Sequence, residues 1–265
     1  MTPYFETENG KLYHGNAKDV MPELEQVDMT LTSPPYDNLR DYEGYEFDFE
    51  GIAKGLYRIT KPGGVVVWVV GDETKNGSES GTSFRQALYF KELGFNLHDT
   101  MIYQKTGFAN PSNNRYHQIF EYMFVFSLGS PKSFNTIIDR KNRYSKAGGR
   151  CKRQKTGETK GGIGGQPLKF YGQRYNIWEI ISVGKANTKH PATFPEALPY
   201  DHICSWSNEG DTILDPMAGS GITLKMAEKL GRKWIGIEIS EKYCEIAAKR
   251  IEAETKQFKL PMVGV

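Results

Sequence analysis

The feature that most constrains this fold is the repeated alternation of short apolar strand patterns with helical patterns. The run 65–70, "VVVWVV", is apolar throughout, which is typical of a strand buried on both faces of a parallel sheet. Further strands are expected at 27–32, 96–104, 121–128, 211–216 and 233–239, and helices at 49–59, 83–94, 222–231 and 241–254. Such alternation predicts an α/β fold, a doubly wound sheet with helices on both faces. A helix at 195–206 is also expected, although Pro199 makes its continuity doubtful.

One basic, glycine-rich stretch interrupts this alternation of strand and helix patterns. Residues 139–174 contain eleven Lys and Arg against two acids, a net charge of +9. Because the whole chain carries +2, the remainder carries 2 − 9 = −7. Such separation predicts an element that binds a polyanion, and the neighbouring aromatics Phe170, Tyr171 and Tyr175 favour nucleic acid. The alternative is a solvated loop, the usual explanation of a charge run.

Other features narrow the class of protein. The three cysteines lie far apart without a CxxC pair, which argues against a disulfide framework or a zinc site and favours a reducing cytoplasm. No run of eighteen apolar residues predicts a membrane span, and residues 1–15 do not resemble a secretory signal. We therefore expect a cytoplasmic protein without a metal site.

The stretch 31–42, "LTSPPYDNLRDY", places two prolines directly after a predicted strand. Proline fixes φ and lacks a backbone donor, so Pro34 and Pro35 cannot continue a central strand. The segment is therefore either a rigid turn or a functional element with a stiff backbone.

The stretch 213–224, "ILDPMAGSGITL", ends a strand with an acid and opens a glycine turn into a helix. Glu238 ends the next predicted strand, where an acid can hold the two hydroxyls of a ribose. Leu224 stands where a dinucleotide motif needs a third glycine, and no P-loop lysine follows. Asp215 would repel a pyrophosphate but suits an ammonium, so these acids favour S-adenosylmethionine. The alternative is a purely structural strand-turn-helix crossover.

The two stretches together resemble the amino DNA methyltransferases of the beta arrangement, in which the catalytic motif comes first and the cofactor loop last. The resemblance rests on "GNAKDV", "TSPPY", "ITKPGG", the basic insertion, "HPATFPEAL", "DPMAGSG" and "IGIEISEKY", and so spans nearly the whole chain. It implies a Rossmann-like S-adenosylmethionine-dependent methyltransferase fold with permuted motif order. It divides the chain into a catalytic half (1–135), a basic target-recognition insertion (136–180) and a cofactor-binding half (181–265).

The resemblance assigns roles to the residues of the catalytic motif. The exocyclic amino nitrogen of a base is a poor nucleophile, because its lone pair is delocalised into the ring. Ser33 Oγ and the Pro34 carbonyl would accept hydrogen bonds from the amino group, and Pro35 would keep that carbonyl fixed. Tyr36 would stack on a base flipped out of the duplex.

The resemblance also implies the contacts with cofactor and DNA. The cofactor residues would be Asn16, Thr32, Phe194, Pro195, Asp215, Pro216, Met217, Gly219, Ser220, Gly221, Thr223 and Glu238. The chain departs from the family pattern at Met217, at Ile222 and at Asn16, where an aspartate often receives the adenine amino group. An amide oxygen can still accept that hydrogen bond. The DNA-binding residues would be Arg140, Lys141, Arg143, Arg150, Lys152, Arg153 and Lys155.

The activity that the resemblance implies is site-specific methylation of an amino group in double-stranded DNA, as in restriction-modification. Cytosine N4 is the expected target, because Ser33 occupies a position that cytosine enzymes of the family fill with serine. No cysteine follows a proline, which excludes the ring-carbon mechanism. The open alternatives are adenine N6, an RNA or protein amino group, and a DNA-binding protein without catalysis. A restriction endonuclease partner, a monomeric or homodimeric state and a bacterial, archaeal or phage host also stay open.

Overall fold

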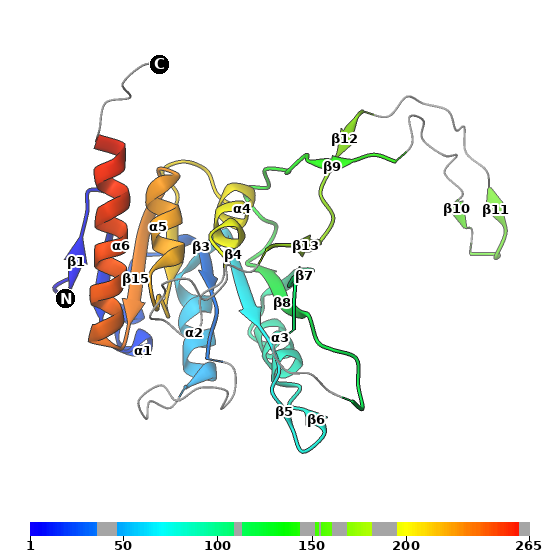
Figure 1. The fold of residues 1–265 in the computed structure, drawn as a ribbon, viewed down its shortest axis with the longest axis horizontal. Helices are drawn as coiled ribbons and strands as arrows, with labels where there is room; N and C mark the ends of the chain where they lie inside the picture. The colour runs from blue at the N-terminus through cyan, green and yellow to red at the C-terminus, as the bar shows by residue number, and fades with distance from the viewer. Residues whose placement is uncertain are drawn as a thin grey trace. The chain divides into compact units, whose positions relative to one another are not determined.

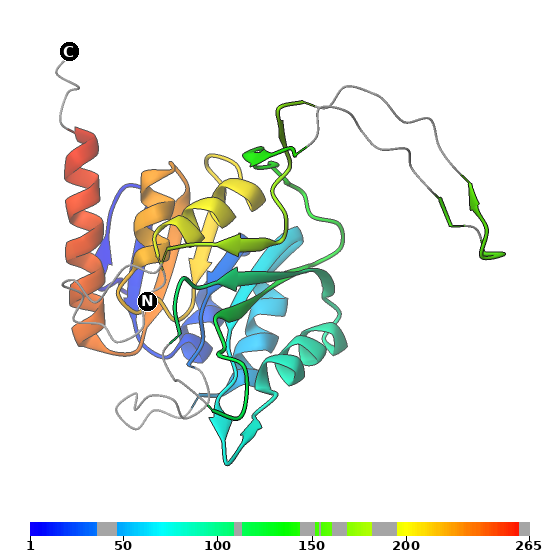
Figure 2. The same cartoon turned by 45° about the vertical axis from the view of Figure 1, so that its right-hand side comes forward.

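The fold is known from a computed structural model, which describes residues 1–35, 47–108, 113–143, 152–153, 155–160, 169–181 and 195–259. The chain forms two compact units (Figures 1 and 2). The body comprises Met1–Asn135 and Asn176–Val265, and the insertion unit comprises Thr136–Tyr175.

A nine-stranded sheet of the described residues forms the centre of the body, in the order β1-β2-β15-β14-β3-β4-β8-β7-β13. In that order the strands are Phe5–Glu6, Gly10–His14, Lys233–Glu238, Thr212–Asp215, Val27–Thr32, Thr60–Val70, Phe120–Ser127, Asn96–Gln104 and Ile177–Glu179. The neighbouring strands β2, β15, β14, β3 and β4 are all parallel to one another, whereas β8 is antiparallel to both β4 and β7. Every residue of β3 is buried, as expected of a central parallel strand.

Helices cover both faces of this sheet. They are α1 (Ala17–Val20), α2 (Phe49–Ile59), α3 (Thr82–Glu92), α4 (Ala197–Trp206), α5 (Ile222–Lys229) and α6 (Glu241–Lys259), with a 3-10 turn at Met21–Glu23. The first three share one core with alternate residues of β4, of which Trp68 is the largest. The last three lie in a row (Figure 1), with α5 between its neighbours α4 and α6. The predicted α/β class is thus confirmed.

The helix at 195–206 is continuous despite its proline. Pro199 is the third residue of α4, so its nitrogen belongs to the first turn, where backbone N–H groups have no partner within a helix. A proline at this position therefore removes no helical hydrogen bond.

The insertion unit contains short antiparallel strand pairs. One pair joins β9 (Arg140–Lys141) to β12 (Tyr171–Gly172), and the other joins β10 (Lys152–Arg153) to β11 (Thr159–Lys160). We expected the insertion to extend to residue 180, but the unit ends at Tyr175. The reason is that β13 pairs in parallel with β7, with Ile177 opposite Ile102, and so belongs to the body.

Asparagines fix the body on either side of the insertion. The Asn135 side chain donates to the carbonyls of Cys204 and Ser207, both at 3.0 Å. The Asn176 side chain donates to the Thr100 carbonyl at 3.1 Å. The backbone carbonyl of Asn176 accepts from Ile102 N at 2.8 Å. The body residues that flank the insertion on both sides are therefore held in place by hydrogen bonds within the body.

A small hairpin follows β4. It consists of β5 (Thr74–Lys75) and β6 (Ser78–Glu79), which pair antiparallel. The hairpin lies just beyond the carboxyl end of β4, which is parallel to β3.

Candidate active site

The two motifs of the sequence meet at one edge of the sheet. Strands β3 and β14 are parallel neighbours, with Leu214 opposite Thr30, so "TSPP" and "DPMAGSG" both leave from carboxyl ends. The Thr32 hydroxyl donates to Asp215 Oδ1 at 2.8 Å, a buried bond between residues 183 positions apart. This bond ties the start of one motif to the start of the other.

The catalytic motif leaves β3 directly after this bond. Pro34 is buried, while Ser33 and Pro35 are partly exposed, so the serine is accessible and the backbone behind it is packed. Tyr36, the expected stacking residue, lies outside the described residues.

The glycine loop begins at Asp215 and ends at α5. Gly219 and Gly221 have φ values of +50° and +75°, in the left-handed region that favours glycine. A Cβ on Gly221 would lie 2.7 Å from Ala247 Cβ on α6, so only glycine allows the two helices to approach this closely. The loop is also held by a hydrogen bond of 2.9 Å from Ala218 N to the Ile237 carbonyl.

The remaining cofactor candidates lie in this loop or next to it. Pro216, Ser220 and Thr223 are buried, and Met217 is partly exposed. Pro195 is buried just before α4, whereas Phe194 lies outside the described residues.

Asp215 is buried in a way that affects its titration. Its side chain is 3% exposed, and Oδ1 also accepts from Met217 N at 3.2 Å. Burial raises the pKa of Asp215 to about 6, although the hydrogen bond from Thr32 opposes this shift. The carboxylate therefore points inward and joins the two loops.

Glu238 ends β15 beside the glycine loop. Its Oε2 accepts from Gly219 N at 2.7 Å and its Oε1 from Ser240 N at 2.9 Å. Burial raises the pKa of Glu238, which the two backbone donors oppose. Each oxygen receives one of these bonds and keeps acceptor capacity for another donor, such as a ribose hydroxyl.

Asn16 follows β2, which pairs in parallel with β15 and places His14 opposite Glu238. It is the N-cap of α1, and its Oδ1 accepts from Lys18 N at 3.0 Å. The residue therefore lies at the same edge as Glu238. Its amide oxygen already has one partner, a capping role that the motif pattern did not predict.

Two further residues at this edge were missed from the sequence. Asp72 follows β4 and accepts from Ser83 N at 2.8 Å, which fixes the start of α3. Arg250 on α6 donates to the Ser220 carbonyl at 2.6 Å and to Ser220 Oγ at 2.7 Å. Arg250 is partly exposed and follows the buried Ala247 by three residues, so the two lie on the same side of α6. An arginine beside a buried position was the available signal.

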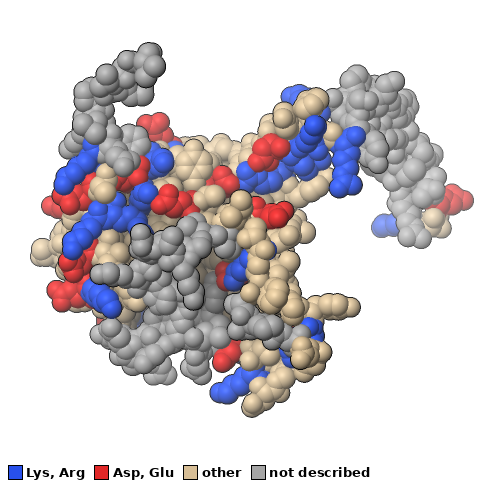
Figure 3. Space-filling model, viewed as in Figure 1, with Lys and Arg blue, Asp and Glu red and all other residues tan. Residues whose placement is uncertain are grey.

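The basic insertion combines cations with aromatic rings, and Lys and Arg gather on its described part (Figure 3). The Arg140 guanidinium lies 4.3 Å from the Tyr175 ring centroid, and Lys141 Nζ lies 5.3 Å from that of Phe170. Arg143 and Lys155 are exposed. Arg150 and the side chains of Lys152 and Arg153 lie outside the described part of the chain.

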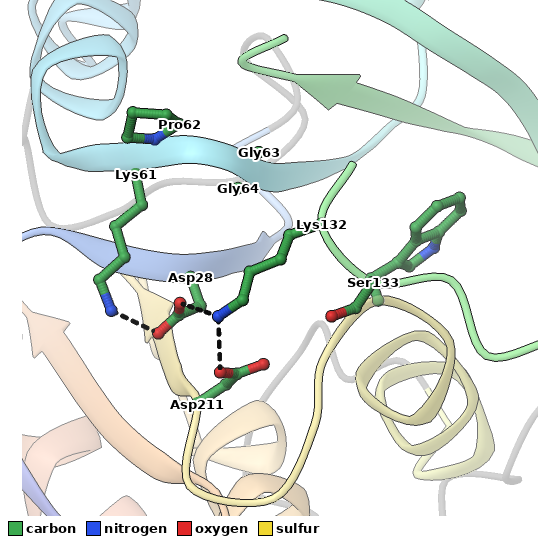
Figure 4. Close-up of a pocket in the computed structure, with 9 residues that line it drawn as sticks. Asp28, Lys61, Pro62, Gly63, Gly64, Lys132, Ser133 and Asp211 are labelled. Atoms are coloured by element: carbon green, nitrogen blue, oxygen red, sulfur yellow. Dashed lines mark hydrogen bonds and ion pairs between the residues drawn. The ribbon is translucent and has the colours of Figure 1, made fainter. Parts of the chain in front are cut away.

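A pocket of about 220 Å³ lies at the opposite edge of the sheet, where β3, β4 and β14 begin (Figure 4). Lys61 contacts Asp28 at 2.7 Å, and Lys132 lies 3.8 Å from Asp28 and 3.7 Å from Asp211. Although burial alone would raise the pKa of Asp28, the hydrogen bonds from Lys61 and Thr212 N lower it overall. These paired charges connect strand beginnings, so we interpret the cluster as structural.

Within the described ranges, no group of three or more His, Cys, Asp and Glu side chains is arranged to hold a metal ion. The described helices include none that is both long and apolar enough to span a bilayer.

Comparison with known proteins identifies the family. Residues 27–249 match the sequence model of a protein family described as "DNA methylase". The orphan methyltransferase M.BamHII of Bacillus amyloliquefaciens is 54% identical over 89% of this chain and 96% of its own. The type II methyltransferase M.ScaI of Streptomyces caespitosus is 29% identical over 97% of this chain and 86% of its own.

The fold is shared with solved methyltransferases. PvuII DNA methyltransferase, named as cytosine-N4-specific, has a TM-score of 0.67 at 20% identity, over 96% of this chain and 93% of its own. M1.HpyAVI, solved with S-adenosylmethionine, has a TM-score of 0.62 at 23% identity, over 91% of this chain and 99% of its own. The resemblance found in the sequence motifs is confirmed, and the chain belongs to the DNA methylase family.

Proposed function

We propose that this DNA methylase transfers the methyl group of S-adenosylmethionine to the N4 amino group of a cytosine flipped out of double-stranded DNA. The observation that carries the proposal is the bond from Thr32 to Asp215, which joins the catalytic strand to the cofactor loop. Methyl transfer requires acceptor and donor at one place, and this bond keeps the two motifs together.

The residues present fit S-adenosylmethionine, the methyl donor of this family. Glu238 offers acceptor capacity for the ribose hydroxyls, and the glycine loop precedes α5, whose N-terminus favours an anionic group. Asp215 holds Thr32 and the backbone of Met217, so we assign it to loop positioning rather than to an ammonium contact. When bound, the cofactor supplies an electrophilic methyl group.

The chain's own residues activate the amino group. Ser33 Oγ and the Pro34 carbonyl accept hydrogen bonds from the two N–H groups of the amino group. These hydrogen bonds draw the nitrogen toward tetrahedral geometry and localise its lone pair. The buried Pro34 allows this carbonyl little movement, so the acceptors are in place before the reaction. As the new nitrogen–carbon bond forms and the carbon–sulfur bond of the methyl donor breaks, the amino group releases one proton to solvent.

Cytosine is favoured over adenine by Ser33 and by the PvuII enzyme, which is named as cytosine-N4-specific. DNA is favoured over RNA or protein by the description of the family. The relative M.BamHII is named an orphan methyltransferase, so we further propose that the chain marks DNA without a paired endonuclease.

The experiment is product identification. The protein is incubated with unmethylated bacterial DNA and methyl-labelled S-adenosylmethionine, and the DNA is digested to nucleosides that are separated by mass and retention. Label in N4-methylcytosine is the expected result. Label in N6-methyladenine would overturn the choice of base but keep the methyltransferase, and no label in DNA would overturn the function.

A further inference from the structure

Arg250 of α6 holds the glycine loop through hydrogen bonds to Ser220. It extends from α6, and its Nη1 donates both to the Ser220 carbonyl at 2.6 Å and to Ser220 Oγ at 2.7 Å. Ser220 is 4% exposed and stands between Gly219 and Gly221, two glycines with positive φ. Two hydrogen bonds from one charged group therefore hold Ser220 in place between the two glycines.

The environment of this arginine differs from that of its neighbours. On α6, Lys249 contacts Glu245 at 2.5 Å and Lys256 contacts Glu252 at 2.9 Å, as exposed pairs one helical turn apart. Among the described residues, Arg250 forms no ion pair with a carboxylate and donates to the loop instead. Its compensating charge in that part of the structure is Glu196, which interacts with it electrostatically without forming an ion pair.

Ser220 directly precedes Gly221, the N-cap of α5. The loop leads into α5, so the position of Ser220 sets the direction of the backbone amides at the start of that helix. A guanidinium behind these amides adds to the positive potential of the helix N-terminus. In S-adenosylmethionine, the group that such a potential attracts is the carboxylate of the amino-acid half.

We propose that Arg250 is a positioning residue for the amino-acid half of the cofactor, acting through Ser220 and the glycine loop. The proposal rests on the proposed function, since it takes S-adenosylmethionine as the ligand. The adenosine half depends on Glu238, which is also held by Ser240 N at 2.9 Å, outside the glycine loop. Loss of Arg250 is thus expected to affect one half of the ligand more than the other.

Calorimetric titration with two ligands tests this division. S-adenosylhomocysteine contains both halves, whereas methylthioadenosine lacks the amino acid. Arg250→Met keeps the apolar stem but removes charge and donors, so affinity for S-adenosylhomocysteine is expected to fall about tenfold or more. Affinity for methylthioadenosine is expected to change by less than about twofold, since its contacts remain.

Two further variants complete the experiment. Arg250→Lys keeps the charge with a single donor group and is expected to give an intermediate loss for S-adenosylhomocysteine. Lys249→Met changes the adjacent, exposed residue of α6 and is expected to bind both ligands like the wild type. Thermal unfolding of each variant verifies that the compared proteins are folded.

The outcomes are distinct. Equal weakening of both ligands in Arg250→Met and Arg250→Lys would overturn the proposal, because a purely structural role would affect the whole site. Unchanged binding of both ligands would overturn it as well. A wild-type protein that binds neither ligand would instead overturn the proposed function, and this proposal with it.

Discussion

At the scale of single residues, the site depends on a buried carboxylate. The pKa of Asp215 is raised from 3.8 to about 6 by burial. The folded protein therefore retains a proton that the unfolded chain releases, so this residue makes stability fall as pH rises through that interval. Below pH 4 both states are protonated and the effect vanishes.

Asp215→Asn removes this titration while keeping an oxygen that can accept from Thr32. Relative to wild type, the variant is expected to gain about 3 kcal/mol in free energy of unfolding between pH 4 and pH 7. Urea unfolding of both proteins across that range measures the difference. A difference independent of pH would show that Asp215 titrates normally in the folded protein.

Ser33 is expected to act on the reaction and not on cofactor binding. Ser33→Ala removes one acceptor for the amino group, so single-turnover methyl transfer is expected to slow about 100-fold. Affinity for S-adenosylhomocysteine should stay as in the wild type. Ser78→Ala, in the exposed β5–β6 hairpin, serves as the control, and an unchanged rate in Ser33→Ala would remove the serine from the mechanism.

At the scale of elements, the contact between α5 and α6 depends on Gly221. Its φ is +75°, and a Cβ added to it would lie only 2.7 Å from Ala247 Cβ, so both the backbone and the packing oppose any side chain. Replacement by alanine thus combines a backbone penalty with a steric one.

Gly221→Ala is expected to lower the free energy of unfolding by about 2–4 kcal/mol, from about 1 for the φ and 1–3 for the clash. Gly210→Ala provides the matched control, because Gly210 has a φ of +82° with nothing within 4 Å of its Cβ position. The control should lose only about 1 kcal/mol in the same urea titration. Equal losses in both variants would argue against the steric contribution.

At the scale of the whole molecule, charge is divided between the body and the insertion. Arg143 and Lys155 are exposed on the insertion, so their replacement by alanine tests whether it binds DNA. The double variant is expected to weaken duplex binding and to reduce the slope of log affinity against log salt by about 2. Replacement of Lys249 and Lys256 on α6, which removes equal charge, should leave that slope unchanged.

Much of this architecture could be predicted, because buried parallel strands contain apolar runs such as residues 65–70 of β4, and the polar residues of β3 alternate with apolar ones. The end of the insertion could not. Strand β13 is only three residues long and has one buried position, Trp178, so no periodicity marks it. Its assignment to the body follows from pairing with β7.

The site residues differ in the same way. Ser33, Asp215 and Glu238 belong to short motifs, so the sequence was sufficient to select them as candidates, although the hydrogen bonds of Asp215 indicate a different role from the expected ammonium contact. Arg250 and Asp72 act through backbone groups of distant residues, Ser220 and Ser83, and such contacts exist only after folding. The cap formed by Asn16 is a local contact. It was not predicted because the helix that it begins has only four residues, too few to show a helical pattern in the sequence.

The hydrogen bonds of Asn135 and Asn176 have a consequence for how such proteins diversify. The insertion is one uninterrupted stretch of chain, and the residues that flank it, Asn135 and Asn176, are held by hydrogen bonds within the body. If the insertion recognises the DNA sequence, as the resemblance implies, a single recombination event that replaces codons 136–175 is expected to change the preferred DNA sequence while leaving the chemistry intact. Recognition can then evolve as an exchangeable cassette, at a different pace from the catalytic body.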